Sequence, residues 1–261
     1  MDKKFVRQQP SQTLARGIQV LEAFTLERPE WGVRELSREL DSNPASIHRI
    51  VTTLCNAGYL EQVEETQRYR LGTKGLRLAG VYTRQNPISS VGRKVFEQFI
   101  DQFPYNFYLG KITRFKIIYM AALDGHGPLK VTMEPGGTID LHDSAVGKVL
   151  LAFQDAAFIE EFLTREPFEC FTRHTITDAA TLKQQLEEIR QQGYAINVGE
   201  HYEDVGSVAV PILRPDGPPE LAVSLTYPTL VMQEGRLTVE GLVPLAREIA
   251  GAIGTRLGVA P

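Results

Sequence analysis

Apolar side chains recur every three or four residues in the N-terminal third of the chain, which is the spacing of amphipathic helices. The pattern predicts one helix over residues 13–25 and two more over residues 33–40 and 44–57. The apolar stripe expected to face inward from the first helix consists of Leu14, Ile18, Leu21 and Phe24 or Thr25. The stripes of the next two helices consist of Val33, Leu36 and Leu40, and of Ile47, Ile50, Val51 and Leu54.

The third of these segments has the features of a DNA-reading helix. Asn43 suits the N-cap, Pro44 suits the first helical position, where its missing N–H costs nothing, and Gly58 provides a glycine stop. The face opposite the apolar stripe carries small, polar and cationic side chains without a carboxylate: Ala45, Arg49, Thr52 and Asn56, with Ser46 and His48 beside them. Such a face suits a major groove, where it meets base edges and phosphates.

Two short strands are expected next, over residues 59–63 and 68–71, joined by the polar stretch 64–67. This hairpin is typical of a wing, with Arg68 and Arg70 placed near a phosphate backbone. Residues 32–72 therefore predict a winged helix-turn-helix that binds double-stranded DNA. The alternatives are a small helical protein-interaction module and a winged helix that no longer touches DNA.

A linker helix is predicted over residues 73–85. It is expected to end there because Pro87 disfavours helical geometry in the residue before it. Its apolar face consists of Leu76, Ala79 and Tyr82 or Thr83. The next helix, over residues 88–103, aligns Ile88, Val91, Val95 and Phe99 and ends before Pro104. The chain thus divides into a flexible N-terminal tail (1–12), a DNA-binding domain (13–72), a linker helix (73–87) and a second domain (88–261).

The sequence of the second domain alternates between segments with strand patterns and segments with helical patterns. Strands are expected over residues 105–112, 115–123 and 128–133, and again over 194–198, 205–213 and 220–227. Helices are expected over residues 144–153, 155–164 and 178–192, with a closing amphipathic helix over 237–257. Three strands, then helices, then three strands and a helix predict an α+β fold, an antiparallel sheet with helices packed around it.

Composition places the chain among ordinary globular proteins, with 43% hydrophobic and 23% charged residues. No apolar run approaches the roughly 18 residues of a membrane span, and the N-terminus lacks a signal-peptide core. Cys55 and Cys170 are the two cysteines, so a disulfide framework is not expected. These features favour a cytoplasmic protein that associates with the nucleoid through DNA.

Charge is distributed unevenly along the chain. The formal net charge is −4, which combines a net charge of +3 over residues 1–86 with −7 over the remainder. A mildly basic front on an acidic body is typical of a DNA reader joined to a domain that does not bind DNA.

Candidate chemistry in the second domain begins where residues 144–148 open a helix. A cap by Asp143 or Ser144 would leave the following N–H groups free to bind an anion. Gly147-Lys148 is not a phosphate-binding loop, because the glycine required five residues earlier is His142. Small polar residues also interrupt the later strands, at Asn197, Ser207, Ser224 and Thr226. They form either the wetted side of a sheet or the polar floor of a pocket for a small carboxylate or hydroxy acid.

Three other functions are weighed against a ligand-binding regulator. An enzyme or a metal site would draw on Cys170, His142, His174, His201, Glu200 and Asp143. No H-E-x-x-H spacing and no G-x-S-x-G elbow occurs, so catalysis is not expected and no metal is assigned. The third is a DNA-binding protein whose second domain only oligomerises.

The chain resembles the isocitrate lyase regulator (IclR) family of bacterial transcription factors over nearly its whole length. The N-terminal likeness lies in SQTLARGIQVLEAF, RELSRELDSNPASIHRIVTTLCNAGYLE and RYRLG. The more specific C-terminal likeness lies in LHDSAVGKVLLA, RQQGYAINVGEHYEDVGSVAVPI and LAVSLTYP, in that order. The resemblance implies a winged-helix domain, a linker helix and a GAF-like effector domain, in chains that form dimers through the N-terminal and linker helices and often tetramers.

Segment by segment, the resemblance and the residue patterns give two candidate sites. The expected DNA-binding residues are Arg16, Ser42, Pro44, Ala45, Ser46, His48, Arg49, Thr52 and Arg68. The expected effector-binding residues are Ala145, Val146, Gly147, Asn197, Ser207, Ser224 and Thr226. Gly199 departs from the family pattern, which often has an acidic residue before Glu200, so the resemblance does not transfer the identity of the effector.

These expectations combine into one mechanism. A dimer or a pair of dimers places two reading helices in successive major grooves of a pseudo-palindromic operator, with half-sites about 10 bp apart or a multiple of it. A small organic acid, and no other cofactor, binds the second domain and changes operator affinity through the linker helix. We expect the protein to repress transcription and the ligand to relieve this repression. Activation of transcription is the alternative.

Overall fold

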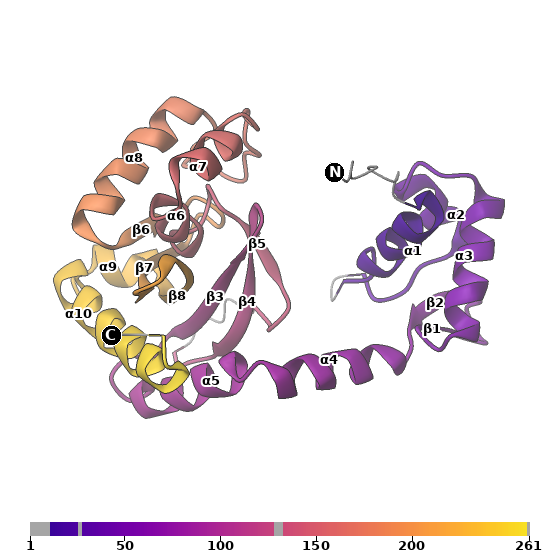
Figure 1. The fold of residues 1–261 in the computed structure, drawn as a ribbon, viewed down its shortest axis with the longest axis horizontal. Helices are drawn as coiled ribbons and strands as arrows, with labels where there is room; N and C mark the ends of the chain where they lie inside the picture. The colour runs from indigo at the N-terminus through magenta and orange to yellow at the C-terminus, as the bar shows by residue number, and fades with distance from the viewer. Residues whose placement is uncertain (1–10, 26–27, 128–132, 260–261) are drawn as a thin grey trace, which may run out of the picture. The chain divides into compact units, whose positions relative to one another are not determined.

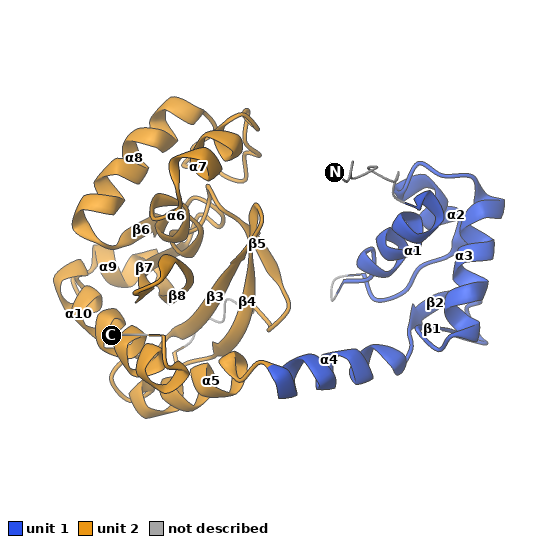
Figure 2. Cartoon of the chain, in the orientation of Figure 1, with its two compact units in different colours: residues 1–85 blue, residues 86–261 orange. Residues whose placement is uncertain are grey.

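The computed structural model describes residues 11–25, 28–127 and 133–259. The chain divides into two compact units, unit 1 over residues 1–85 and unit 2 over residues 86–261 (Figure 2). The tail predicted over residues 1–12 and the strand predicted over residues 128–133 lie almost wholly outside the described residues. No helix in the described part of the chain has the length and apolar character needed to cross a bilayer.

Unit 1 begins with the helices α1 (Gln12–Glu22), α2 (Val33–Glu39) and α3 (Pro44–Asn56), labelled in Figure 1. Their shared core consists of Val20, Phe24, Trp31, Leu36, Ile47, Ile50, Val51, Leu60 and Tyr69. The stripe predicted for α1 is partly wrong, because Leu14 is 65% and Ile18 47% exposed. Apolar residues lie on two sides of α1, and the side that packs on α3 is the one with Gly17 and Val20.

The wing is a two-stranded antiparallel sheet of β1 (Leu60–Gln62) and β2 (Tyr69–Leu71). The backbone of Trp31 also exchanges hydrogen bonds of 2.9 and 2.8 Å with Tyr69, which ties the start of α2 to the wing. Helix α4 (Lys74–Gln85) follows, and none of its residues is buried. It therefore exposes apolar side chains in the single chain, including Leu76 and Leu78.

Unit 2 is built on a six-stranded sheet whose neighbouring strands are all antiparallel, in the order β5-β4-β3-β8-β7-β6. The strands are β3 (Asn106–Thr113), β4 (Lys116–Leu123), β5 (Thr138–Asp140), β6 (Ala195–Val198), β7 (Val205–Arg214) and β8 (Gly217–Pro228). Successive side chains alternate between the two faces of the sheet. Val223 and Leu225 therefore belong to one apolar core, whereas Ala222 belongs to the other.

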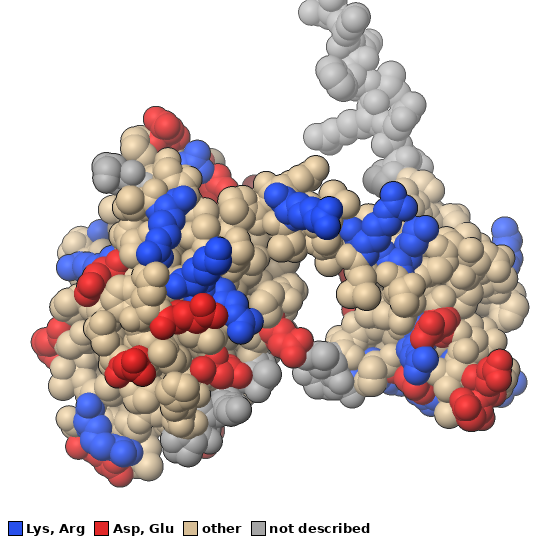
Figure 3. All heavy atoms as spheres, turned by 90° about the horizontal axis from the view of Figure 1, so that it is seen from below, with Lys and Arg blue, Asp and Glu red and all other residues tan. Residues whose placement is uncertain are grey.

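Helices cover both faces of this sheet (Figure 1). The face of Val223 packs against α5 (Ile88–Phe99) and α10 (Val239–Leu257), and the face of Ala222 packs against α6 (Ala145–Ala152) and α8 (Ala179–Gln192). Helix α7 (Ala156–Leu163) adds Phe162 and Leu163 to the second core, and α9 (Thr229–Gln233) follows β8. On the face of unit 2 seen in Figure 3, acidic and basic side chains are interspersed.

The predicted α+β fold class is confirmed, with a helix-turn-helix at the N-terminus and an antiparallel sheet with packed helices at the C-terminus. Two short elements were not predicted. These are β5 and α9, of three and five residues, which are too short to show a period in the sequence.

Candidate functional site

Helix α3 presents a polar face to solvent. Its N-cap is the predicted Asn43, whose side chain accepts a hydrogen bond of 2.8 Å from the Ala45 N–H. Ile47, Ile50 and Val51 are buried beneath the helix, whereas its opposite side is exposed. The exposed residues include the predicted Pro44, Ala45, Ser46, His48, Arg49 and Thr52, and Ser42 just before them is half-buried.

The arginines predicted to contact DNA differ in how the fold uses them. Arg68 donates to Glu35 Oε2 at 2.7 Å and to the Glu30 carbonyl at 3.0 Å, and Arg16 donates to the Leu40 carbonyl. Arg49, in contrast, makes no ion pair with any residue that the structure describes. Of the predicted arginines, Arg68 is therefore the one whose charge is paired with a carboxylate, whereas Arg16 and Arg49 form no ion pair with a described residue.

Glu35 links the start of α2 to the wing. The backbone N–H of Gly32 and the guanidinium of Arg68 both bond its carboxylate and hold its pKa below the ordinary value, even though partial burial opposes them. Arg28 adds a second ion pair at 3.4 Å. These contacts fix the wing against the helices, so Arg68 has a structural role in addition to any contact with phosphate.

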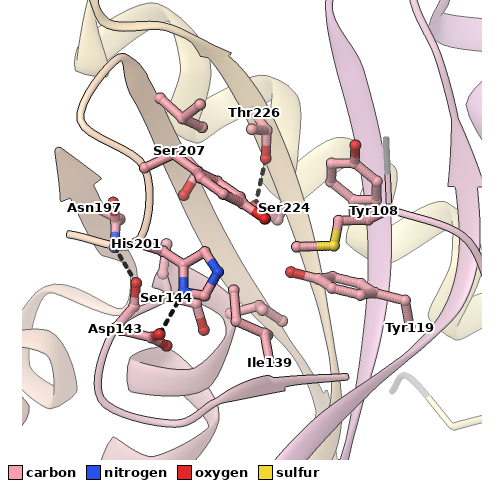
Figure 4. Close-up of a pocket in the computed structure, with 15 residues that line it drawn as sticks. Tyr108, Tyr119, Ile139, Asp143, Ser144, Asn197, His201, Ser207, Ser224 and Thr226 are labelled. Atoms are coloured by element: carbon pink, nitrogen blue, oxygen red, sulfur yellow. Dashed lines mark hydrogen bonds and ion pairs between the residues drawn. The ribbon is translucent and has the colours of Figure 1, made fainter. Parts of the chain in front are cut away.

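Unit 2 contains a pocket at the N-terminus of α6, shown in Figure 4. Ser144 is the N-cap of this helix, and its hydroxyl accepts the Gly147 N–H at 3.0 Å. Ala145 and Val146, which the sequence predicts to bind the effector, line the pocket. Gly147 differs from its prediction: its N–H is used by the cap, and it packs against the backbone of Leu141 rather than lining the pocket.

The predicted polar residues form a row across three neighbouring strands. Asn197 on β6 pairs with Ser207 on β7, and Ser207 pairs with Thr226 on β8. Ser224 lies two residues before Thr226 on the same face, and the two hydroxyl oxygens are 3.4 Å apart. All four residues line the pocket and are buried. They are therefore the floor of a cavity rather than the wetted side of a sheet.

Asn197 has its amide occupied by the protein. Its side-chain nitrogen donates to the Asp143 carbonyl at 2.6 Å, and its oxygen accepts the Glu200 N–H at 3.3 Å. Asn197 therefore joins the segment before α6 to the segment after β6.

Several pocket residues were not among the predicted effector ligands. Tyr108 on β3 and Tyr119 on β4 face the cavity in Figure 4, with ring centroids 5.2 Å apart. Burial raises the pKa of Tyr108 to about 12 and that of Tyr119 further, so both phenols stay protonated at neutral pH. Asp143 and His201 also line the pocket, as a hydrogen-bonded pair. They are 58 residues apart in the chain, and no spacing rule connects them.

A buried ion pair lies behind the pocket. Lys148 Nζ is 2.5 Å from Glu200 Oε1, and the Lys148 side chain is wholly buried. Burial lowers the pKa of Lys148 and raises that of Glu200, because loss of hydration opposes both charges and their mutual attraction offsets only part of it. This pair connects α6 to the segment after β6.

The size of the cavity suits a small ligand. It encloses about 420 Å³ of space free of atoms, a volume that includes the open mouth. The enclosed part of this space is much smaller and admits only a few heavy atoms unless the walls adjust. Among the described residues, no group of three or more His, Cys, Asp or Glu side chains is suited to hold a metal ion.

Comparison with known proteins identifies the class to which this fold and pocket belong. Residues 80–255 match the C-terminal domain of the bacterial transcriptional regulator IclR, and residues 13–64 match the IclR helix-turn-helix domain. The chain belongs to the IclR family, whose members are DNA-binding transcriptional regulators rather than enzymes.

Individual relatives agree with this assignment. The chain is 27% identical to the HTH-type transcriptional regulator BhcR of Paracoccus denitrificans, over 85% of this chain and 80% of that one. An IclR-type regulator from Silicibacter has a structure that matches with a TM-score of 0.82 at 28% identity, over 95% and 98% of the two chains. An IclR homologue from Microbacterium hydrocarbonoxydans, solved with 4-hydroxybenzoate, matches with a TM-score of 0.78 at 25% identity, over 94% and 98%.

Proposed function

We propose that the pocket of unit 2 binds a small organic acid and that binding changes the affinity of unit 1 for a DNA operator. One observation carries the proposal: the start of α6 and the row Asn197, Ser207, Thr226 form a buried polar lining. Burial of so many polar groups is costly unless they are paired, and an oxygen-rich ligand would pair them. The 4-hydroxybenzoate bound by the Microbacterium homologue supports a carboxylate as the class of ligand.

The carboxylate of the ligand would lie at the N–H groups of Ala145 and Val146. The start of a helix offers free N–H donors and the positive end of its dipole. Hydroxyls of Ser207, Ser224 and Thr226 would bond the remaining oxygens. Asn197 would act mainly through the contacts that hold Asp143 and Glu200 in place.

On the DNA side, α3 would lie in a major groove. Arg49 and Ser46 would meet bases or phosphates, with Ser42, Pro44, Ala45, His48 and Thr52 on the same surface. Arg68 and Arg16 would contact the phosphate backbone through the part of each guanidinium that the fold leaves available.

Self-association is part of the proposal. Leu14 and Ile18 of α1 are exposed, as are Leu76, Leu78, Val81 and Tyr82 of α4. A second copy of the chain would cover these apolar side chains and would place two α3 helices on one pseudo-palindromic operator. We favour repression of transcription that the ligand relieves, and activation of transcription is the alternative. The site of action is DNA in the cytoplasm.

A paired screen tests this function. Thermal unfolding of the full chain would be measured with small aliphatic and aromatic carboxylates, beside operator binding at two salt concentrations. We expect at least one acid to raise the unfolding temperature and to change operator affinity, with a coupling of about 1–3 kcal/mol. DNA binding that falls with salt and responds to no acid would instead support a second domain that only assembles the protein.

A further inference from the structure

Asp143 and His201 form a hydrogen-bonded pair in the wall of the pocket. Asp143 Oδ2 lies 2.6 Å from His201 Nδ1, and the Asp143 side chain is wholly buried. Its other oxygen, Oδ1, is also buried and has no hydrogen-bond partner among the described residues. A buried carboxylate that accepts a hydrogen bond from imidazole Nδ1 favours the tautomer with its hydrogen on Nδ1.

The second ring nitrogen of His201 is directed into the cavity. In Figure 4, Nε2 points away from Asp143 toward the space between Tyr119 and Ser224. In the neutral ring with its hydrogen on Nδ1, Nε2 presents a lone pair. We call His201 Nε2 the acceptor edge of the pocket.

The ring cannot readily turn away from this position. Phe171 packs against it with centroids 4.4 Å apart, and Tyr202 meets it edge-on at 4.5 Å and 87°. The backbone beside it is fixed as well, because the neighbouring Glu200 bonds Lys148 and Asn197. Asn197 in turn holds the carbonyl of Asp143. Both members of the pair are therefore anchored to the same framework, so the direction of Nε2 is set before any ligand arrives.

The rest of the lining supplies hydrogen-bond donors. The start of α6 offers N–H groups, and Tyr119, Ser207, Ser224 and Thr226 offer hydroxyls. The acceptor edge offers none in its neutral, Asp143-bonded state. A ligand that satisfies both sides must accept hydrogen bonds at one end and donate one at the other. A carboxylate alone meets only the first requirement.

We infer that His201, held by Asp143, selects among organic acids by accepting a hydrogen bond from a hydroxyl group of the ligand. The inference rests on the proposed function and narrows its ligand to hydroxylated carboxylic acids. An acid of the same size without the hydroxyl would leave the acceptor edge unpaired in a desolvated site. Sites built in this way discriminate strongly against the analogue that lacks the donor.

The test compares matched pairs of acids on the full-length protein by titration calorimetry. The pairs are 4-hydroxybenzoate with 4-methoxybenzoate and with benzoate, and 3-hydroxybutyrate with butyrate. For the pair that binds, we expect the hydroxylated acid to bind at least about tenfold more tightly. His201→Phe keeps an aromatic ring between Phe171 and Tyr202 but removes the acceptor, so it should bring this ratio close to one. The affinity for the acid without the hydroxyl should change little.

Two further variants separate the acceptor from general packing. His201→Gln retains a side-chain acceptor and should restore part of the ratio, whereas Asp143→Asn should reduce it, because an amide no longer fixes the hydrogen on Nδ1. His126→Phe alters an exposed histidine outside the pocket and should leave the ratio unchanged.

A second measurement needs no variant that might unfold. The imidazole nitrogens of the five histidines can be followed by nitrogen NMR in the unaltered protein. His201 should show a hydrogen on Nδ1 and none on Nε2, and the hydroxylated acid should shift Nε2 more than its partner acid does. A ratio that survives His201→Phe, or an Nε2 that carries the hydrogen in the complex, overturns the inference while the proposed function stands. Failure of every acid to bind overturns both.

Discussion

In unit 1 the polar side chains of α3 stand in solvent, with Ser46, Arg49 and Thr52 all exposed. In unit 2 the polar residues of the pocket are enclosed, and Asn197 and Ser224 are only 5% and 3% exposed. The difference follows from the size of the proposed ligands. A duplex covers an exposed face from outside and pairs with it one phosphate or base at a time. A small acid must be surrounded, so the groups that meet it are desolvated in advance.

The two arrangements place different demands on the fold. An exposed arginine can be removed with little effect on stability. Removal of one member of a buried ion pair leaves the other charge buried and unpaired, which lowers stability. Substitutions in α3 should therefore change DNA binding alone. Substitutions around the pocket should change ligand binding, and behind the pocket they should change the stability of unit 2.

The largest effect is expected from the ion pair behind the pocket. Lys148→Met leaves Glu200 buried without its partner and should lower the free energy of unfolding of unit 2 by about 3 kcal/mol or more. Urea unfolding of the full chain, followed separately in each unit, measures this loss. The double variant Lys148→Met with Glu200→Leu should recover much of it. A single variant as stable as the unaltered protein would show that Glu200 is readily protonated in place.

The next effect concerns α3. Arg49→Ala should weaken operator binding by about 1–3 kcal/mol, because it removes a cation from the face that meets the groove. Fluorescence anisotropy with labelled operator at several salt concentrations would measure the loss. The effector affinity should not change. Arg93→Ala removes an exposed arginine of unit 2 and serves as the control. If Arg49→Ala also abolished ligand binding, unfolding rather than a lost contact would be the explanation.

The polar floor of the pocket should give a smaller effect with the opposite selectivity. Ser224→Ala combined with Thr226→Ala removes two buried hydroxyls and should weaken the binding of the acid by about tenfold, since two hydrogen bonds of about 0.7 kcal/mol each contribute about 1.4 kcal/mol together. Operator affinity without ligand should be retained. Calorimetry and operator binding on the same preparation test both statements, with Ser90→Ala on α5 as the control. An unchanged ligand response would remove these residues from the site.

The smallest effect is a dependence of unit 1 on pH. The pKa of Glu35 is held below 4.5 by the Gly32 N–H and by Arg68, so its contribution to stability is present above pH 4.5 and is lost as the pH falls through the lowered value. Unit 1 should therefore become less stable in acid. Glu35→Gln should flatten this dependence in thermal unfolding between pH 6 and about pH 3. An equally steep acid response in the variant would assign it to other carboxylates.

The features that could be predicted from the sequence are those that depend on residues close together in the chain. The cap by Asn43 and the buried stripe of α3 depend on residues within a few positions of one another, and both could be predicted. The inward face of α1 could not, because its periodicity does not tell which of two apolar sides meets α3. The row from Asn197 to Thr226 was suggested by polar residues in apolar strands, yet only the strand register places them in one cavity.

The pair of Asp143 and His201 shows a limit of another kind. Each residue was visible in the sequence as a candidate for enzyme or metal chemistry, but the contact between them depends on how α6 and the segment after β6 meet in space. Neither helical nor strand periodicity carries that information. Contacts of this kind can be found only once the whole sheet is assembled.

Helix α4 has a consequence for how far a signal can be carried. It has 12 residues and none of them is buried. A helix of this length is only marginally stable in water by itself, and helices of similar size exchange with coil in about a microsecond. While α4 is melted, a rotation at one end is not passed to the other. In a lone chain, a rotation caused by ligand binding would therefore not be transmitted along this segment. Transmission would require burial of Leu76 and the neighbouring apolar side chains, which would keep α4 helical.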